Sequence, residues 1–205
     1  MSTQETSSNR VFQMIAGSPT LDFINALDWR FRESGPEELL TSYGALLQFA
    51  GQSGLLNSDF VRHLATTVKG AVGQRVLGDA KELRETLASI VYRSLEGKTP
   101  PAKAMVTLER YFHEAFSRRG LLWRKSQLAW DWTDAANKAE LPLWALSLDA
   151  AELMSSKAVT KIRACNNIDC RWLFLDVSKN HTRRWCDMKL CGNRMKARRF
   201  KANRT

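Results

Sequence analysis

The sequence predicts a mainly α fold: an N-terminal helical domain with one short β-hairpin, followed by a small cysteine-rich C-terminal module. Apolar residues recur at helical spacing through most of residues 20–155. Within this part of the chain, residues 121–132 contain two short apolar runs with the spacing of a hairpin. All four cysteines lie between Cys165 and Cys191. We therefore expect a disordered tail over 1–10, a helical domain over 11–158 and the cysteine-rich module over 160–205.

Composition and the N-terminus indicate the class of protein. The chain has 205 residues, of which 44% are hydrophobic and 25% charged, as in ordinary globular proteins. No apolar run approaches the ~20 residues that span a bilayer. The first ten residues, MSTQETSSNR, lack the apolar core of a signal peptide. We expect a cytoplasmic protein, in which reduced thiols are available to bind metal.

The first helix is predicted to begin at Ser18-Pro19, after a short strand or packed segment over Val11–Ala16. Leu21, Phe23, Ile24 and Leu27 follow at near-helical spacing. Two polar residues between them, Asp22 and Asn25, are either ligand contacts or capping and surface residues. The second interpretation is favoured, because such side chains commonly bond to nearby backbone.

Start signals predict three more helices. Gly35–Glu38 places proline and acidic residues in a first helical turn, where they suit the helix dipole. Asn57 is expected to cap the next helix. Asp79 and Glu82 have the spacing of a capping box, so a further helix is expected to begin there and run to Gly97.

The remainder of the helical domain contains two helices and the hairpin. Thr99–Pro101 starts one helix, and Leu143–Met154 forms the last. Leu121–Trp123 and Leu128–Trp132 form the hairpin between them. Four tryptophans in this part are expected to be mostly core residues, with an aromatic ligand pocket as the alternative. They are Trp123, Trp130, Trp132 and Trp144.

Signals of catalysis are missing from the sequence. His63 and His113 are isolated on predicted helices, and no nucleophile stands beside a base. The glycines are too dispersed for a phosphate-binding loop. We therefore predict no enzymatic activity and no catalytic residue. A neutral domain in front of a basic one suits a regulator, so the helical domain is a candidate ligand-binding or dimerisation domain. The oligomeric state stays open.

The four cysteines form two C-x4-C pairs, Cys165/Cys170 and Cys186/Cys191. Two short loops that each supply two thiolates fill the tetrahedral shell of Zn²⁺ and leave no position for water, so such a site is structural. Two disulfides are an alternative that needs an oxidising compartment, and an iron–sulfur cluster uses the same ligands. His181 is also close enough in sequence to replace one cysteine. The favoured prediction is one structural zinc ion per chain.

The net charge of the protein is concentrated in the same region. Residues 161–205 contain 13 Lys+Arg and 3 Asp+Glu, which gives 13 − 3 = +10. The whole chain is also +10, so residues 1–160 sum to zero. A charge concentrated in this way is typical of a polyanion-binding surface, and nucleic acid is the usual polyanion.

The residues around the second cysteine pair resemble the CGNR-type zinc finger of bacterial proteins. The tetrapeptide Cys191–Arg194 carries the name of that family, and RWLFLDVSKNHTRRW before it follows the same pattern. The front segment, AGSPTLDFINALDWR, resembles the start of the helical ABATE domain that usually precedes this finger. The resemblance implies a transcription regulator with a C-terminal DNA-binding finger.

The finger is expected to be similar to a treble-clef module. The two metal-binding turns would alternate with three strands, at 161–164, Trp172–Leu175 and Trp185-Cys186. A helix would follow the second turn and run through Lys201. Asn193 is expected to cap that helix. Because a module of about 45 residues has a small core, zinc would supply much of its folding free energy, on the order of 10 kcal/mol.

Basic residues of the finger are the candidate nucleic-acid contacts: Arg183, Arg184, Arg194, Lys196, Arg198, Arg199 and Lys201. Arginine pairs bidentately with guanine, so Arg194 or Arg198 would read bases while the lysines contact phosphate. Trp172 and Trp185 would stack on unpaired bases or pack in the core. DNA is the preferred partner. An RNA partner and a zinc-stapled protein-interaction module are the alternatives.

Overall fold

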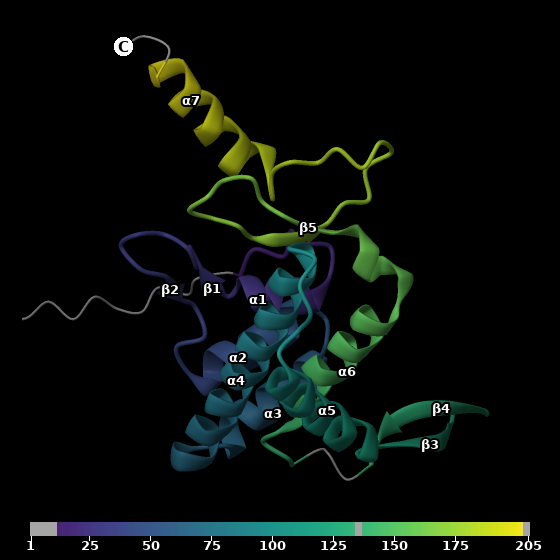
Figure 1. The fold of residues 1–205 in the computed structure, drawn as a ribbon. Coiled ribbons are helices and arrows are strands. Elements are labelled where there is room, and N and C mark those ends of the chain that lie inside the picture. Colours follow the sequence, from purple (N-terminus) through teal and green to yellow (C-terminus); the bar gives the residue numbers. More distant parts are fainter. Residues whose placement is uncertain (1–11, 134–136, 203–205) are drawn as a thin grey trace, which may run out of the picture.

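The structure, a computed structural model, describes residues 12–133 and 137–202; the predicted tail over 1–10 lies outside them. Figure 1 shows a body of helices with three two-stranded antiparallel sheets. The helices are α1 (Pro19–Asn25), α2 (Tyr43–Gln52), α3 (Ser58–Thr67), α4 (Gly70–Leu95), α5 (Ala102–Ser117), α6 (Leu141–Ser155) and α7 (Asn193–Ala202). The strands are β1 (Leu27–Asp28), β2 (Glu37–Glu38), β3 (Arg119–Arg124), β4 (Gln127–Trp132), β5 (Ile162–Ala164) and β6 (Leu173–Leu175). The predicted mainly α fold class is confirmed.

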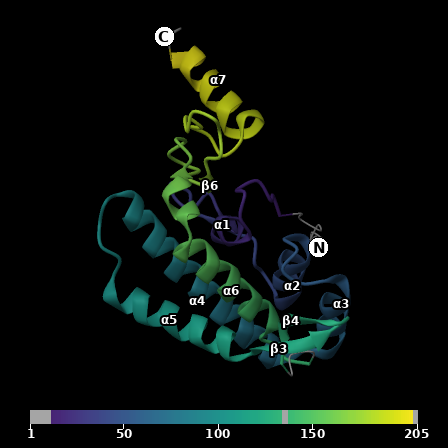
Figure 2. The same ribbon diagram turned by 90° about the vertical axis from the view of Figure 1, so that its right-hand side faces the viewer.

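The two ends of the molecule have different structures. Helices α1, α4, α5 and α6 pack into the body, and α7 projects from one end (Figure 2). The β3–β4 hairpin projects from the opposite end (Figure 1).

Apolar side chains of α1, α2 and α4, such as Phe23, Phe49 and Leu83, have no exposed surface and form the core. No helix within the described ranges is long and apolar enough to cross a membrane.

Helix α1 starts at Pro19 as predicted, but its two polar residues are not at the surface. Asp22 and Asn25 are 7% and 4% exposed. The Asp22 carboxylate accepts hydrogen bonds from the backbone N–H groups of Ile15 (3.1 Å) and Ala16 (3.0 Å). Burial raises the pKa of Asp22 to about 6, although these two bonds oppose the rise. The prediction that Asp22 and Asn25 lie at the surface was wrong, but Asp22 bonds nearby backbone as expected, because the irregular segment before α1 needs acceptors for its buried N–H groups.

Gly35–Glu38 does not open a helix. Glu37–Glu38 forms β2 and pairs with β1, with Leu27 opposite Glu38. The Glu38 carboxylate binds the Arg84 guanidinium of α4 at 2.7 and 2.8 Å, and Arg84 is only 3% exposed. A buried arginine needs a carboxylate partner, and this contact holds Glu38 in an extended segment. Helix α2 therefore begins later, where Ser42 Oγ accepts a hydrogen bond from Ala45 N.

The predicted start of α4 at Asp79 was also wrong, because Asp79 and Glu82 lie inside a 26-residue helix that begins at Gly70. The apolar period extends upstream to Val76, which is fully buried. Other boundaries were predicted well. Asn57 caps α3 with its side chain, and α5 begins directly after Pro101.

The predicted hairpin is present as β3 and β4. Its tryptophans are only partly in the core. Trp144 of α6 is buried and packs against Trp132, with ring centroids 6.3 Å apart. Trp123 and Trp130 are 69% and 60% exposed, which corrects the prediction that most of these tryptophans are core residues. The hairpin extends beyond the helices, so no helix or strand of the described residues covers these two rings.

Candidate metal centre and nucleic-acid interface

The four cysteine side chains converge on one buried point. Their Sγ atoms all lie within 4.8 Å of one another, and all four are free thiols. The Sγ atoms of Cys170 and Cys186 are 3.8 Å apart. Zinc–sulfur bonds of about 2.3 Å in a tetrahedron place the sulfur atoms roughly 3.8 Å from each other. The residues therefore fit one structural zinc ion, held by Cys165, Cys170, Cys186 and Cys191.

The first metal-binding turn follows β5. Cys165 N donates to Trp172 O (2.8 Å), and Cys170 N and Arg171 N both donate to Asn167 O. Arg171 has a positive φ of 54°, which lets the chain reverse into β6. The Asn167 side chain is fully buried, and its amide lies 3.6 Å from Cys191 Sγ. Such a donor orients a ligand and offsets thiolate charge. Sequence reasoning missed Asn167, since asparagine in a turn has no distinctive signal.

The second turn is a π-helical segment, η2 (Met188–Gly192), that continues into α7. Asp187 caps it by accepting a hydrogen bond from Leu190 N (2.8 Å). Asn193 has helical φ and ψ of −66° and −39°, so the prediction that it caps α7 was wrong. The helix already begins one turn earlier. At Gly192, a Cβ atom would lie 2.7 Å from Met188 Sδ, so a larger residue there would displace the half-exposed Met188 side chain.

The predicted third strand at Trp185-Cys186 is not formed. The Arg183 guanidinium replaces a strand partner there: it donates to Trp185 O (3.0 Å), to Cys186 O and to Ile15 O (3.4 Å). It also lies over the Phe174 ring, 4.3 Å from the centroid. One arginine thus satisfies carbonyl groups that a ladder would otherwise pair. Arg183 is half-buried and engaged within the protein.

The finger is fastened to the helical domain by hydrogen bonds from distant parts of the sequence. The Asn25 side chain donates to Leu173 O and accepts from Leu173 N, each at 2.9 Å, so it imitates a neighbouring strand beside β6. Ala16 O accepts from Leu175 N (2.8 Å). Trp172 Nε1 donates to Asp28 (2.8 Å). The finger therefore has structural support besides the metal.

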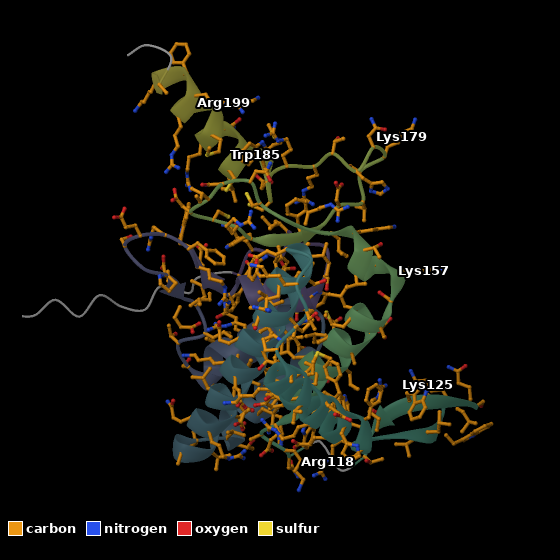
Figure 3. All side chains as sticks on the ribbon, in the orientation of Figure 1. Arg118, Lys125, Lys157, Lys179, Trp185 and Arg199 are labelled. Atoms are coloured by element: carbon orange, nitrogen blue, oxygen red, sulfur yellow. The ribbon has the colours of Figure 1, made fainter. Side chains whose placement is uncertain are left out.

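The candidate nucleic-acid contacts differ in whether another part of the protein already engages them. Arg194 and Arg198 are exposed but engaged within the protein, because Arg194 lies 4.7 Å over the Trp29 ring and Arg198 pairs with Asp169 of the first metal-binding turn at 2.8 Å. Four other candidates are also exposed: Arg184, Lys196, Arg199 and Lys201. Figure 3 shows Arg199 pointing outward from α7. His181 Nδ1 instead lies 3.1 Å from Asp176 O, outside the thiol cluster.

These features define a class of protein: a helical domain joined to a basic zinc finger with four cysteine ligands. The chain belongs to the ABATE family, described as "Putative stress-induced transcription regulator", whose model matches residues 17–157. Residues 161–204 match the CGNR zinc finger. Both families and their order were predicted from the sequence. No curated protein matches the chain. The family and the thiol cluster together establish a zinc-binding protein of a regulator family.

Proposed function

We propose that this protein is a transcription regulator that binds duplex DNA through α7. The observation that carries the proposal is the projecting, zinc-anchored helix, with five basic and no acidic residues between Asn193 and Ala202. An α-helix with its side chains is about 10–12 Å wide, and the major groove of B-DNA is about 12 Å wide. A helix that projects from the body enters such a groove without a clash from the rest of the protein.

The basic residues of α7 have different roles in the proposed contact with DNA. Lys196, Arg199 and Lys201 contact phosphates, because their side chains are exposed along the outer part of α7. Arg194, fixed on Trp29 near the start of the helix, sets the orientation of α7. Base contacts from Arg198 require it to leave Asp169. Zinc is structural: it holds η2, which positions α7.

Duplex DNA is favoured over single-stranded RNA by the burial of Trp172, while Trp185, the other tryptophan of the finger, is partly exposed with the Arg184 guanidinium 5.7 Å from its ring centroid. Recognition of unpaired bases relies on exposed aromatic rings for stacking. Trp172 is 7% exposed and donates its indole N–H to Asp28, so its ring is unavailable to a base. The proposal includes no catalytic step.

Replacement of Lys196, Arg199 and Lys201 by alanine is expected to weaken duplex binding and to reduce its salt dependence. Each lost phosphate contact lowers the slope of log K against log salt by about 0.9, so the triple variant should lose roughly 2–3 from the slope. The measurement is fluorescence anisotropy with a labelled duplex over a series of salt concentrations.

A matched control removes three exposed lysines outside the finger: Lys98→Ala, Lys103→Ala and Lys157→Ala. The control has the same net charge as the α7 variant, so its slope should stay at the wild-type value. An α7 variant with an unchanged slope would contradict the assignment. Stronger competition by structured RNA than by duplex DNA would move the function to RNA binding.

A further inference from the structure

The β3–β4 hairpin has an apolar face that the finger does not use. The register places Leu121 opposite Trp130 and Trp123 opposite Leu128. Because side chains alternate between the two faces of a strand, these four lie on the same face. They are 53%, 60%, 69% and 61% exposed, in that order. We call these four residues the hairpin patch.

The hairpin patch lies on one face of the hairpin, and the same face packs against the core where the hairpin leaves the helical body. Trp132, on the same face, packs against the buried Trp144. The Arg119 guanidinium lies over the Trp130 and Trp132 rings, 6.0 and 5.5 Å from their centroids. The base of the β3–β4 hairpin is therefore held in place, while its apolar tip projects beyond the helices (Figure 1). Contiguous apolar surface of this kind marks an interaction site more often than isolated apolar residues do.

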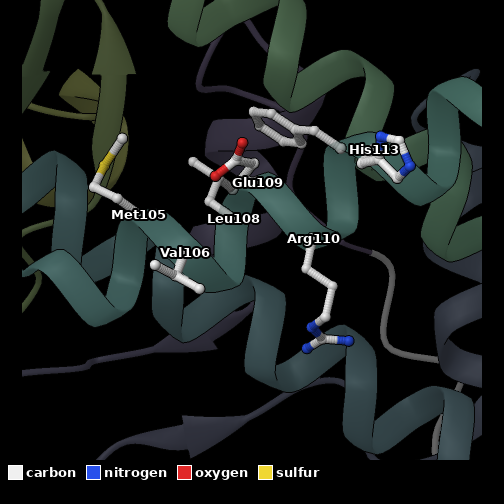
Figure 4. Close-up of a pocket in the computed structure, with 7 residues that line it drawn as sticks. Met105, Val106, Leu108, Glu109, Arg110 and His113 are labelled. Carbon is white, nitrogen blue, oxygen red and sulfur yellow. The ribbon is translucent and has the colours of Figure 1, made fainter.

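A second apolar feature is a groove between α5, α6 and the base of β3. The groove has a volume of about 580 Å³. Its apolar lining includes Met105, Phe112 and Phe116 of α5 and Leu148 and Met154 of α6. Met105 and Phe116 are 47% and 59% exposed. Figure 4 shows Met105 and its neighbours along α5, where a second pocket of about 700 Å³ adjoins the groove. We call this feature the α5–α6 groove.

We propose that a second copy of this chain covers both features. The hairpin patch of each copy lies in the α5–α6 groove of the other. One feature projects and the other is concave, both are mainly apolar although Arg119 and Glu152 also line the groove, and both belong to the same domain. A reciprocal contact of this kind closes as a two-fold dimer, the commonest form of homo-oligomer. Met105 and Met154 add side chains that adapt readily to an inserted ring.

The available area agrees with a dimer. From their exposed fractions, the two tryptophans of the patch expose roughly 300 Å², and the two leucines bring the patch to about 500 Å². Met105 and Phe116 add about 200 Å². The sum of ~700 Å² per copy is close to the ~800 Å² that each partner buries in a stable interface. A partner that covers only one feature would bury less.

Charge and position also favour a second copy. Residues 1–160 contain 18 Lys+Arg and 18 Asp+Glu (31 − 13 and 21 − 3), so two helical domains approach without net repulsion. The hairpin and α7 lie at opposite ends of the molecule, so the dimer leaves both basic helices free (Figure 2). The inference does not rest on DNA binding, and its test needs no nucleic acid.

Sedimentation velocity on the zinc-loaded full chain tests the dimer. Wild-type protein is expected to sediment with twice the 23.3 kDa chain mass. The hairpin variant Trp123→Ser with Trp130→Ser should sediment as a monomer that still unfolds cooperatively, with a lower melting temperature because the dimer no longer stabilises the folded chain. The groove variant Phe116→Ser with Met105→Ser should shift toward monomer in the same way. The control Val177→Ser removes an exposed apolar side chain (73%) at the finger and should remain dimeric.

Three results would overturn the proposal. The first is a wild-type monomer at all soluble concentrations. The second is a dimer that persists in the hairpin variant. The third is loss of the dimer in the hairpin variant only, because the hairpin patch would then not bind in the α5–α6 groove. Since both double variants change exposed side chains, folding is checked by circular dichroism and a cooperative melting curve.

Discussion

Cys191→Ser is expected to abolish zinc binding and to unfold η2 and α7 while the helical domain stays folded. Oxygen is a poorer ligand than thiolate for this soft tetrahedral site, and zinc binding contributes on the order of 10 kcal/mol to small fingers. Helix α7 packs mainly on η2, and its other contacts are the exposed side chains of Arg194 with Trp29 and of Arg198 with Asp169, so we expect it to depend on the metal. By contrast, β6 stays bound to Asn25 and Ala16. Hydrogen exchange read by mass spectrometry should show lost protection over residues 186–202 and retained protection in α4.

His181→Ala is the matched control for this prediction. His181 is the other side chain in the finger that binds metals readily, but its imidazole bonds to Asp176 O and is not part of the thiol cluster. The variant should retain one zinc per chain and full protection of α7. A Cys191→Ser protein that keeps both zinc and a protected α7 would show that the cluster does not hold the helix.

Asn25→Ala is expected to lower the free energy of unfolding by about 2–4 kcal/mol. The substitution leaves both the N–H and the C=O of Leu173 without the partners they have in the structure, at a position with no exposed surface. Each unsatisfied buried group costs roughly 1–3 kcal/mol. The measurement is urea denaturation of the zinc-loaded protein, with tryptophan fluorescence as the probe.

Two further variants separate the hydrogen bonds from general effects of the substitution. Asn25→Asp keeps an acceptor for Leu173 N but loses the donor to Leu173 O, and its charge is buried, so it should not restore the wild-type value. Asn180→Ala changes an exposed asparagine of the finger and should cost less than about 0.5 kcal/mol. If Asn25→Ala lowers the free energy of unfolding no more than Asn180→Ala does, the Asn25 hydrogen bonds do not hold the finger to the helical domain.

Local signals predicted much of this structure. The cysteine spacing predicted the ligand cluster, because the ligands of each pair are only five residues apart and their geometry is set within a short loop. The caps at Asn57 and Pro101 were predicted for the same reason, since a cap is read from its neighbours. The mainly α fold class follows from apolar periodicity, which is also local.

Predictions failed where a distant partner determines the local conformation. Glu37–Glu38 has the composition of a first helical turn, but the contact with Arg84, 46 residues away, holds Glu38 extended. Asn25 has no neighbour that indicates its role, because its partner Leu173 is 148 residues away. Asn167 in the metal site is similar, since its contact is with Cys191. Such contacts depend on tertiary packing, which cannot be predicted from the pattern of neighbouring residues in the sequence.

The measurement that most directly tests a zinc-dependent DNA-binding regulator combines two readouts on one sample. Zinc per chain is determined in freshly reduced protein, and duplex binding is then compared before chelation, after chelation and after zinc is restored. We predict about one zinc per chain, since one cluster of four thiols is present in the described residues. Binding should be lost on chelation and recovered with zinc. Protein without zinc, or duplex binding that survives chelation unchanged, would contradict the account.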